Sequence, residues 1–413
     1  MTIPILYLLS RGVSASSSTA NITTTIPSTC DDVNTCRTLT SLVWSCLATI
    51  TTCTWLAIHP NVPDRDDPNW LKFLRKFKIL IFALIAPEMM VLWAMRQRIN
   101  ARKIANRFQA MGWTETHGYF MLMGGFLLED EKGCVRTLTA DDLENLSLED
   151  KVAFPDITKD EIEDRGKDNA FARVLVLIQT IWFAIQCFAR LVHHLPITEL
   201  ELTTLGYVVI NLGVRWLWWN KPLDVGCPVT VHIGTIATED KSTMRHQIIP
   251  SNGPPDRKLI PLSLYDALIG FGGFPLTSEA TRVPTFYSGS LTASHTAIAG
   301  MTSALFGTVF GAIHFIAWMY PFPSSVWQRS WRYCSSGITA TTLFFFIVNL
   351  GDLVLGLSVA TRKDQGFNAI IFIAFCFIFL YRIGLIVAAF VCLKSLPSGA
   401  LRTVSWNDLI PHV

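Results

Sequence analysis

Hydrophobic residues recur in long runs along most of the chain, with two polar stretches between them. A helix needs about 20 predominantly apolar residues to cross the hydrocarbon core of a bilayer. The runs that meet or approach this length lie at 39–58, 79–95, 171–189, 202–219, 296–320, 337–360 and 368–393. The expected fold class is therefore all-α, a polytopic membrane helix bundle of about seven transmembrane helices with two sizeable polar loop segments.

The same pattern divides the chain into consecutive ranges. They are a Ser/Thr-rich tail with a candidate signal peptide at 1–38, transmembrane helices one and two at 39–95, a polar segment at 96–170, transmembrane helices three and four at 171–219, an irregular polar loop at 220–295, transmembrane helices five to seven at 296–393 and a C-terminal tail at 394–413.

The first polar segment has elements of its own. RINARKIANRFQAMGW predicts a basic amphipathic helix that continues the second span, and HGYFMLMGGFLL followed by EDEKG and CVRTLT predicts two strands around a turn. Thr139 with Asp142, and Thr158 with Glu161, have the spacing of helix-capping pairs.

Composition supports a membrane protein. Half of the 413 residues are hydrophobic and 16% are charged, whereas soluble domains carry about 25% charged residues. The mean hydropathy is +0.37. With 34 basic and 32 acidic residues the net charge is +2, so charge gives no reason to expect nucleic acid as a partner. The expected partners are the lipid bilayer and a lipophilic small molecule, and the oligomeric state is left open.

Two sequons and the basic residues suggest an orientation. With seven spans, Asn21-Ile-Thr and Asn145-Leu-Ser fall on the same side, and most basic residues of the short loops fall on the other. We therefore expect a glycoprotein of the endoplasmic reticulum or another endomembrane with a lumenal N-terminus. The basic cluster at 96–107 opposes this orientation. In a lumenal tail Cys30 and Cys36 could form a disulfide.

Several blocks carry a resemblance. They include RTLTSLVWSCLATITTCTWLAIHPNVP, LIAPE, THGYFMLMGGFLL, QTIWFAIQCFAR, TELELTTLGY, WWNKPLDV and GAIHFIAWMYPFP. Together they resemble a large, little-characterised family of multi-pass integral membrane proteins from filamentous and mushroom-forming fungi. The likeness covers most of 37–332. It implies no settled activity, and members that lie near specialised-metabolite genes favour a terpenoid or other lipophilic substrate.

Three residues within the apolar runs are candidate catalytic groups: Glu88, Asp352 and His314. Ionisable side chains at membrane depth are costly and are functional hypotheses by default. A carboxylic acid kept neutral by an apolar chamber is a competent general acid. The alternative for each is a hydrogen bond between helices that fixes packing. Arg215 and Arg382 also lie in apolar runs and need carboxylate or carbonyl partners that sequence cannot assign.

A polar cluster between the third and fourth spans is a candidate substrate-binding site, comprising Arg190, His194, Glu199 and Glu201. Trp182 and Trp318 are the aromatic residues expected to contact a lipophilic substrate. The alternative for the cluster is a helix start capped by Thr198 with solvated charges.

Motifs for cofactors and metals are not found, so we expect none of either. The acidic residues Asp64, Asp66 and Asp67 would suit Mg²⁺ and a diphosphate but lack the spacing of a membrane prenyltransferase. The leading hypothesis is a membrane-embedded enzyme, such as a terpenoid cyclase or isomerase, that uses a buried acid. A transporter or channel, and a receptor-like or scaffold protein, are the alternatives.

Overall fold

A computed structural model describes residues 36–64, 67–129, 135–166, 170–233, 276, 280–356 and 365–404. The expected signal peptide, the sequon at Asn21, Cys30 and the EDEKG turn lie wholly or largely outside these residues.

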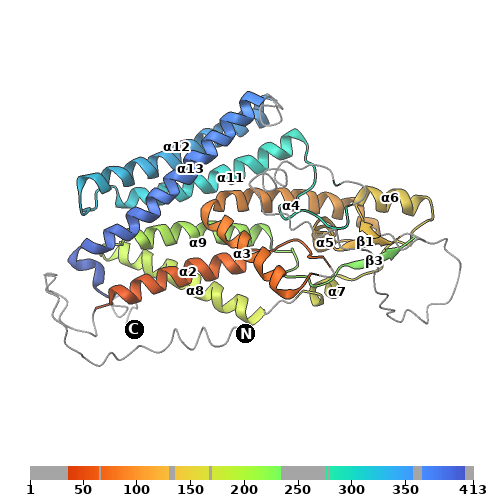
Figure 1. Cartoon of the computed structure of the whole chain (residues 1–413), viewed down its shortest axis with the longest axis horizontal. Coiled ribbons are helices and arrows are strands. Elements are labelled where there is room, and N and C mark those ends of the chain that lie inside the picture. The colour runs from red at the N-terminus through yellow and green to blue at the C-terminus, as the bar shows by residue number, and fades with distance from the viewer. Residues whose placement is uncertain are drawn as a thin grey trace, which may run out of the picture.

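Long helices lie roughly side by side in a bundle (Figure 1). They are α2 (Leu39–Ala57), α8 (Ala170–Val192), α9 (Glu199–Leu217), α11 (Ala293–Ile313), α12 (Ser325–Leu355) and α13 (Gln365–Cys392). Five helical segments among the described residues are long and apolar enough to cross a membrane, and they belong to α2, α8, α11, α12 and α13. The sixth bundle helix, α9, does not meet this measure. The five segments are consistent with an integral membrane protein.

The outer surface of the bundle is apolar. Residues of α8, α12 and α13 that point away from the other helices are large and hydrophobic, as shown by the exposure of Ile178, Phe188, Phe344, Ile347, Ile373 and Leu380. A soluble protein rarely exposes a continuous apolar surface of this extent. The surface therefore suits contact with lipid chains.

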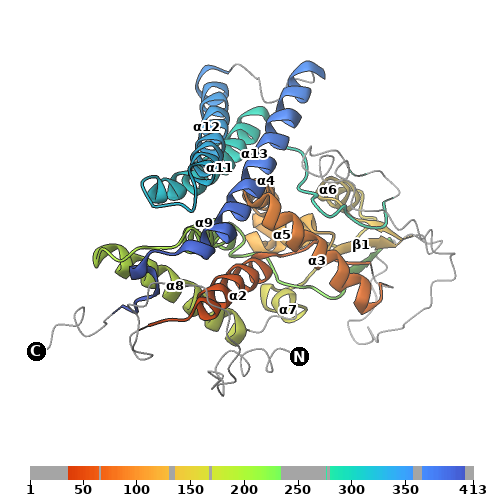
Figure 2. The same cartoon turned by 60° about the vertical axis from the view of Figure 1, so that its left-hand side comes forward.

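Helix α9 lies in the centre of the bundle. It packs against α2, α4 (Pro87–Arg107), α8, α11 and α13, and in Figure 2 it runs between α8 and the α11–α13 group. Gly206 permits the close approach of α11, because a Cβ there would lie 2.8 Å from the ring of Phe310. The polar residues Glu201 and Asn211 of α9 are buried against protein.

The expected second span at 79–95 is not one helix. It is interrupted at Ala86, where α3 (Asn69–Ile85) and α4 meet with a bend of 114°. Pro87 cannot donate a backbone hydrogen bond, and it disfavours helical geometry in the residue before it. Ala86 accordingly has φ −135° and ψ 64°. The expected basic amphipathic helix is present as the second half of α4.

The polar segments form a cap at one end of the bundle. It contains η1 (Gln109–Met111), α5 (Glu115–Leu122), α6 (Ala140–Leu148) and α7 (Lys159–Asp164) around a small sheet. The strands β1 (Phe126–Glu129), β2 (Val135–Thr137) and β3 (Val229–His232) have the order β2-β1-β3, antiparallel and then parallel. The cap has its own hydrophobic core, which includes Trp113, Phe120, Phe126, Leu128 and Leu143.

Two expectations for the polar segments are corrected here. HGYFML is helical in α5 rather than extended, because Thr114 and His117 form a capping box and Gly118 allows the helix to lie directly on Ala101 of α4. The range 220–295 is not wholly irregular, since β3 completes the sheet beside β1. The two expected capping pairs at Thr139 and Thr158 are confirmed.

The two ends of the described chain meet at the end of the bundle opposite the cap (Figure 1). The backbone N–H of Arg37 donates to the carbonyl of Leu401 at 2.8 Å, and Cys36 pairs with Arg402 as an isolated antiparallel bridge. Cys36 is disulfide-bonded.

Candidate functional site

Glu88 lies in the first turn of α4, where the interrupted pair α3–α4 meets the rest of the bundle. Its carboxylate is 2.9 Å from the guanidinium of Arg382 in α13, and both side chains are buried. Apart from this contact, neither carboxylate oxygen has a hydrogen-bond partner among the described residues. The structure thus assigns the buried cation Arg382 to Glu88, a pairing that the sequence left open.

Aromatic side chains surround this ion pair and connect it to His314. The guanidinium of Arg382 lies 4.3 Å from the ring centroid of Phe310. Phe310 contacts both Tyr207 and His314, at centroid separations of 5.5 and 4.7 Å. His314 Nδ1 donates to the carbonyl of Phe310 at 2.7 Å, which leaves Nε2 as an acceptor; it is buried and has no hydrogen-bond partner within the described part of the chain.

Asp352 is placed far from His314. It is buried one turn before the end of α12, whereas His314 packs against Trp331 near the start of that helix. The separation of Trp331 and Asp352 along the helix is about 30 Å, at about 1.5 Å per residue. Of the three candidate catalytic residues, the structure therefore brings Glu88 and His314 into one cluster and leaves Asp352 at the opposite end of α12 from His314.

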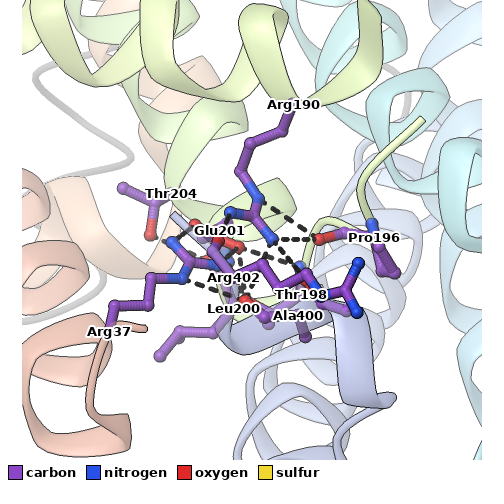
Figure 3. A network of polar contacts seen from close by, with 10 residues as sticks. Arg37, Arg190, Pro196, Thr198, Leu200, Glu201, Thr204, Ala400 and Arg402 are labelled. Atoms are coloured by element: carbon purple, nitrogen blue, oxygen red, sulfur yellow. Dashed lines mark hydrogen bonds and ion pairs between the residues drawn. The ribbon is translucent and has the colours of Figure 1, made fainter. Parts of the chain in front are cut away.

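The polar cluster around Arg190 forms a clamp on the chain ends (Figure 3). Arg190 donates to the carbonyls of Pro196, Gly399, Ala400 and Arg402 at 2.7–3.2 Å. Glu201 forms a bidentate ion pair with Arg37 and also caps α9 through Thr198. These contacts fill the polar capacity of both groups with the protein itself.

The other residues expected to bind substrate do not join this clamp into a pocket. Glu199 is buried in the first turn of α9, and His194 adopts a positive φ of 53° in the turn before it. Trp182 is 47% exposed on the outward face of α8. The guanidinium of Arg332 donates to the carbonyl of Trp318 at 2.8 Å and lies over the Trp318 ring. A structural role therefore accounts for the clamp more directly than substrate binding does.

A cavity of about 230 Å³ lies at the boundary between the bundle and the cap, where the sequence predicted no site. It is lined by His59, Glu163, Arg215, Trp218, Trp219, Asn220, Lys221, Pro222 and Leu223. These residues come from the loop after α2, from α7 and from the end of α9 with the loop that follows. We call it the boundary cavity. The only sign of this cavity in the sequence was the block WWNKPLDV. This block is part of the resemblance to the fungal family, and it supplies most of the lining residues.

Lys221 is the most unusual residue in the wall of the boundary cavity. Its side chain is buried, and its ammonium group donates to the carbonyl of His59 and to Oε1 of Gln97. The ammonium also lies 4.8 Å from the ring centroid of Trp93 and 4.5 Å from that of Trp218. Burial lowers the pKa of Lys221 well below its usual value, while carbonyl acceptors and indole faces stabilise the cation.

Gln97 holds this arrangement together. Its Oε1 accepts from Lys221 and from Trp218 Nε1, at 2.8 and 3.0 Å, and its Nε2 donates to Asn61 Oδ1 and the carbonyl of Tyr287. A carboxamide has two donors and two acceptor positions. All four are used, so α4 fixes the side chain of Lys221 in one place.

The electrostatic surroundings of His59 are positive. Burial lowers the pKa of this histidine well below its usual value, and the charges of Lys221, Arg215 and Lys76 lower it further. Its Nδ1 donates to the carbonyl of Ala57 at 2.9 Å. The neutral imidazole therefore faces a wall rich in cations.

A narrow crevice of about 30 Å³ has one lining residue in common with the boundary cavity. It lies between α2, α8 and α9 and is lined by Cys53, Leu56, Ala57, Val176, Leu177, Thr180, Asn211, Leu212 and Arg215. Arg215 lines both spaces and donates to the carbonyl of Leu56 at 3.3 Å. The crevice is mainly apolar and lies on the side of α8 that borders its outward face.

Metal binding finds no support among the described residues, in which no group of three or more His, Cys, Asp or Glu is placed to hold an ion. In the acidic loop after α2, Asp67 pairs with Arg75 and accepts the backbone N–H of Asp64. Asp66 lies outside the described residues.

Comparison with known proteins places the chain in a family. The model of a family of unknown function (DUF8562) matches residues 3–245, more than half of the chain. The chain belongs to this family. All residues that line the boundary cavity and the crevice fall within the matched range, whereas His314, Asp352 and Arg382 fall outside it. No curated protein and no solved structure matches.

Proposed function

We propose that this member of the DUF8562 family is a polytopic membrane protein that crosses the bilayer six times. The bundle helices α2, α8, α9, α11, α12 and α13 make the crossings. Arg37 and Leu401 are hydrogen-bonded at the end opposite the cap, and two chain ends on one side require an even number of crossings. This proposal differs from the seven crossings that the sequence alone predicts.

Helices α3 and α4 form a re-entrant pair in this topology. Val62, before α3, and Phe108, after α4, both belong to the core of the cap. A bend of 114° exceeds a right angle, so α4 runs back toward the side from which α3 came (Figure 1). Non-crossing segments of this kind are tolerated in a membrane where protein surrounds them, as it does around Glu88.

The orientation that we propose has a lumenal N-terminus and a cytosolic cap. Disulfides persist in oxidising compartments, and Cys36 is disulfide-bonded at the end away from the cap. Cys227, an exposed cysteine of the cap, is free. Asn145 lies in α6 of the cap, so its sequon faces the cytosol in this orientation. The sequons alone predict instead that Asn145 lies in the lumen with Asn21.

The function that we propose is that of a membrane-embedded enzyme acting on a lipophilic substrate that enters from the bilayer. The observation that carries this proposal is that Arg215 lines both an apolar crevice beside α8 and a polar cavity between the bundle and the cap. Such a pair of spaces suits a substrate with an apolar part and a polar part. Concave sites with a few convergent polar groups are the usual form of active sites.

The reacting groups in this proposal are those of the boundary cavity. His59 is kept neutral and is a candidate general base, and Gln97 holds the side chain of Lys221 beside it. The narrower hypothesis of a terpenoid cyclase or isomerase requires Glu88 as a proton donor. It receives less support, because Arg382 compensates the charge of Glu88.

A transporter is the second candidate, and one observation favours it. The N-terminal end of α4, which carries Glu88, lies within the bundle next to a charged partner. Discontinuous helices whose ends meet charged groups near the midplane are typical of transporter binding sites.

Metabolite profiling with crevice variants tests the proposed function. A strain that lacks the protein is compared with strains that carry wild type, Thr180→Trp in the crevice, or Ile178→Trp on the exposed face of the same helix. The enzyme proposal expects a lipophilic metabolite to accumulate in the deletion strain and in Thr180→Trp, and not in Ile178→Trp. His59→Gln should retain protein levels and lose at least tenfold in product.

Two outcomes contradict the enzyme proposal. One is that no lipophilic metabolite differs between the deletion strain and wild type. The other is that purified protein in liposomes moves the metabolite between the two sides without changing it, which is the result expected of a transporter.

A further inference from the structure

Helix α3 presents an exposed apolar stripe. Four large side chains recur along it at spacings of three and four residues, which places them on one side of the helix. They are Trp70, Phe73, Phe77 and Ile81. We call them the α3 stripe, and each of them is 42–62% exposed. The opposite side of the helix is buried at Ile79 and Ala83, so α3 has one face toward the protein and one apolar face away from it.

Aromatic and charged contacts hold the first half of α3 beside the cap-side end of α2 (Figure 1). The ring of Phe73 lies 5.7 Å from that of Trp55, in the last turn of α2. The ammonium group of Lys76 lies 4.9 Å from the centroid of the same indole and binds Asp224, in the loop after α9, at 2.6 Å. The first half of α3 therefore lies where the bundle meets the cap.

This level suits the headgroups of a bilayer. Trp216 and Trp219, at the cap-side end of α9, are also exposed, and exposed tryptophans at helix ends concentrate where hydrocarbon meets water. After Lys78 the rest of α3 is apolar, and the helix ends at the buried Ala86 next to Glu88. The α3 stripe therefore runs from the headgroup level toward the hydrocarbon.

A row of three cations lies on the flank of α3. Lys72, Arg75 and Lys78 are three residues apart, and such rows are inclined to the helix axis, so this row approaches the α3 stripe at Lys78. In the loop before α3 the described acids are Asp64 and Asp67. Asp67 binds Arg75, whereas neither lysine has an ion-pair partner in the part of the chain that the structure describes. Both lysines can therefore meet negative charge from outside the protein.

We infer that α3 is a binding site for an anionic phospholipid of the leaflet next to the cap, with the headgroup at Lys72 and Lys78 and the acyl chains on the α3 stripe. The charge of the row matches an anionic headgroup, and the adjoining stripe matches the chains. This inference goes beyond the proposed enzyme activity and does not require it.

Photolabelling of the full chain in phosphatidylcholine nanodiscs tests this inference. Phosphatidylglycerol and phosphatidylcholine probes that carry the same diazirine chain differ in headgroup charge. Labelling of 69–85 is divided by labelling of 365–392 in α13, after cleavage by a protease that does not act at lysine. Each lysine near an anionic headgroup contributes about a fivefold preference, so this ratio should be at least about tenfold higher for the anionic probe in wild type.

The double variant Lys72→Gln with Lys78→Gln should reduce this preference to about twofold or less. Lys72→Arg with Lys78→Arg keeps both charges and should retain it, which separates loss of charge from misfolding. Lys151→Gln removes a lysine of the cap that is paired with Glu149 and should leave the preference unchanged.

Three results overturn the inference. The first is equal labelling of α3 by the two probes in wild type, and the second is an unchanged preference in the double glutamine variant. The third is labelling of α13 without labelling of α3 by either probe, which would show that the α3 stripe is covered by protein. The enzyme proposal stands or falls separately, by the metabolite profiles.

Discussion

Buried cations in this protein are compensated in three different ways. Arg382 has a carboxylate, Arg190 has backbone carbonyls from two chain segments, and Lys221 has amide oxygens and indole faces. The arrangement around Arg190 is complete within the protein, whereas the guanidinium nitrogens of Arg382 have no hydrogen-bond partner among the described residues beyond the ion pair with Glu88. Lys221 differs because no carboxylate is among its described contacts and because it borders a cavity.

A double-mutant cycle on Glu88 and Arg382 separates packing from catalysis. Glu88→Gln and Arg382→Met should each lower stability by about 3 kcal/mol, because each leaves a buried group without its partner. The double variant should regain most of this loss. Thermal or denaturant-induced unfolding in detergent micelles measures the three changes.

The control for this cycle is Glu149→Gln, an exposed residue of the cap that should change stability by less than about 0.5 kcal/mol. Additive losses in the double variant would contradict a direct interaction. If the double variant is stable yet makes no product, Glu88 also has a chemical role.

At the scale of elements, helix termini decide where the chain turns. Pro87 interrupts what would otherwise be an apolar span, and four capping boxes start helices at Thr114, Thr139, Thr158 and Thr198. Asp142 belongs to one of them. Its carboxylate accepts the side-chain O–H of Thr139 at 2.8 Å and binds Arg136 of β2 at 2.7 Å. The start of α6 is thereby tied to the sheet.

The cap should lose stability in acid partly through Asp142. Partial burial opposes the shift, but hydrogen bonds from Arg136 and Thr139 hold the pKa of Asp142 below its usual value in the folded state. A lowered folded pKa contributes stability above the unfolded value of about 3.9 and loses it as the pH falls through the folded value. Between pH 5 and pH 3, wild type should therefore lose more protection from hydrogen exchange in α6 than Asp142→Asn does.

The exchange experiment measures protection factors of the α6 amides by mass spectrometry. At pH 5 Asp142→Asn should itself reduce them about fivefold, which corresponds to about 1 kcal/mol for a helix start. An equal pH dependence in wild type and Asp142→Asn would rule out this contribution.

At the scale of the whole molecule, the clamp of Arg190 and the pairing of residues 36–37 with 401–402 fix both chain ends to one end of the bundle. The cap occupies the other end (Figure 1). These two facts support the even number of crossings and the re-entrant α3–α4 pair that we propose.

Epitope tags test this topology in sealed microsomes. Tags at the two termini should be protected from protease together, and a tag within 234–275, next to β3, should be digested. Asn145→Gln should leave the glycosylation of the protein unchanged, because α6 faces the cytosol in the proposed orientation. Termini in opposite compartments would favour the seven crossings that hydropathy alone suggests.

The sequence by itself determined the helical class, most of the bundle helices and the capping of α6, α7 and α9. These features depend on hydrophobic periodicity and on contacts within a few residues, both of which can be seen in a single chain. The run at 79–95 was different, because it looks continuous by hydropathy and only the tertiary structure reveals the bend of 114° at Ala86. The partner of Glu88, the clamp around Arg190 and the boundary cavity were decided by the tertiary structure. Each joins residues more than 100 positions apart, and which charges and rings meet across such distances depends on how the helices pack.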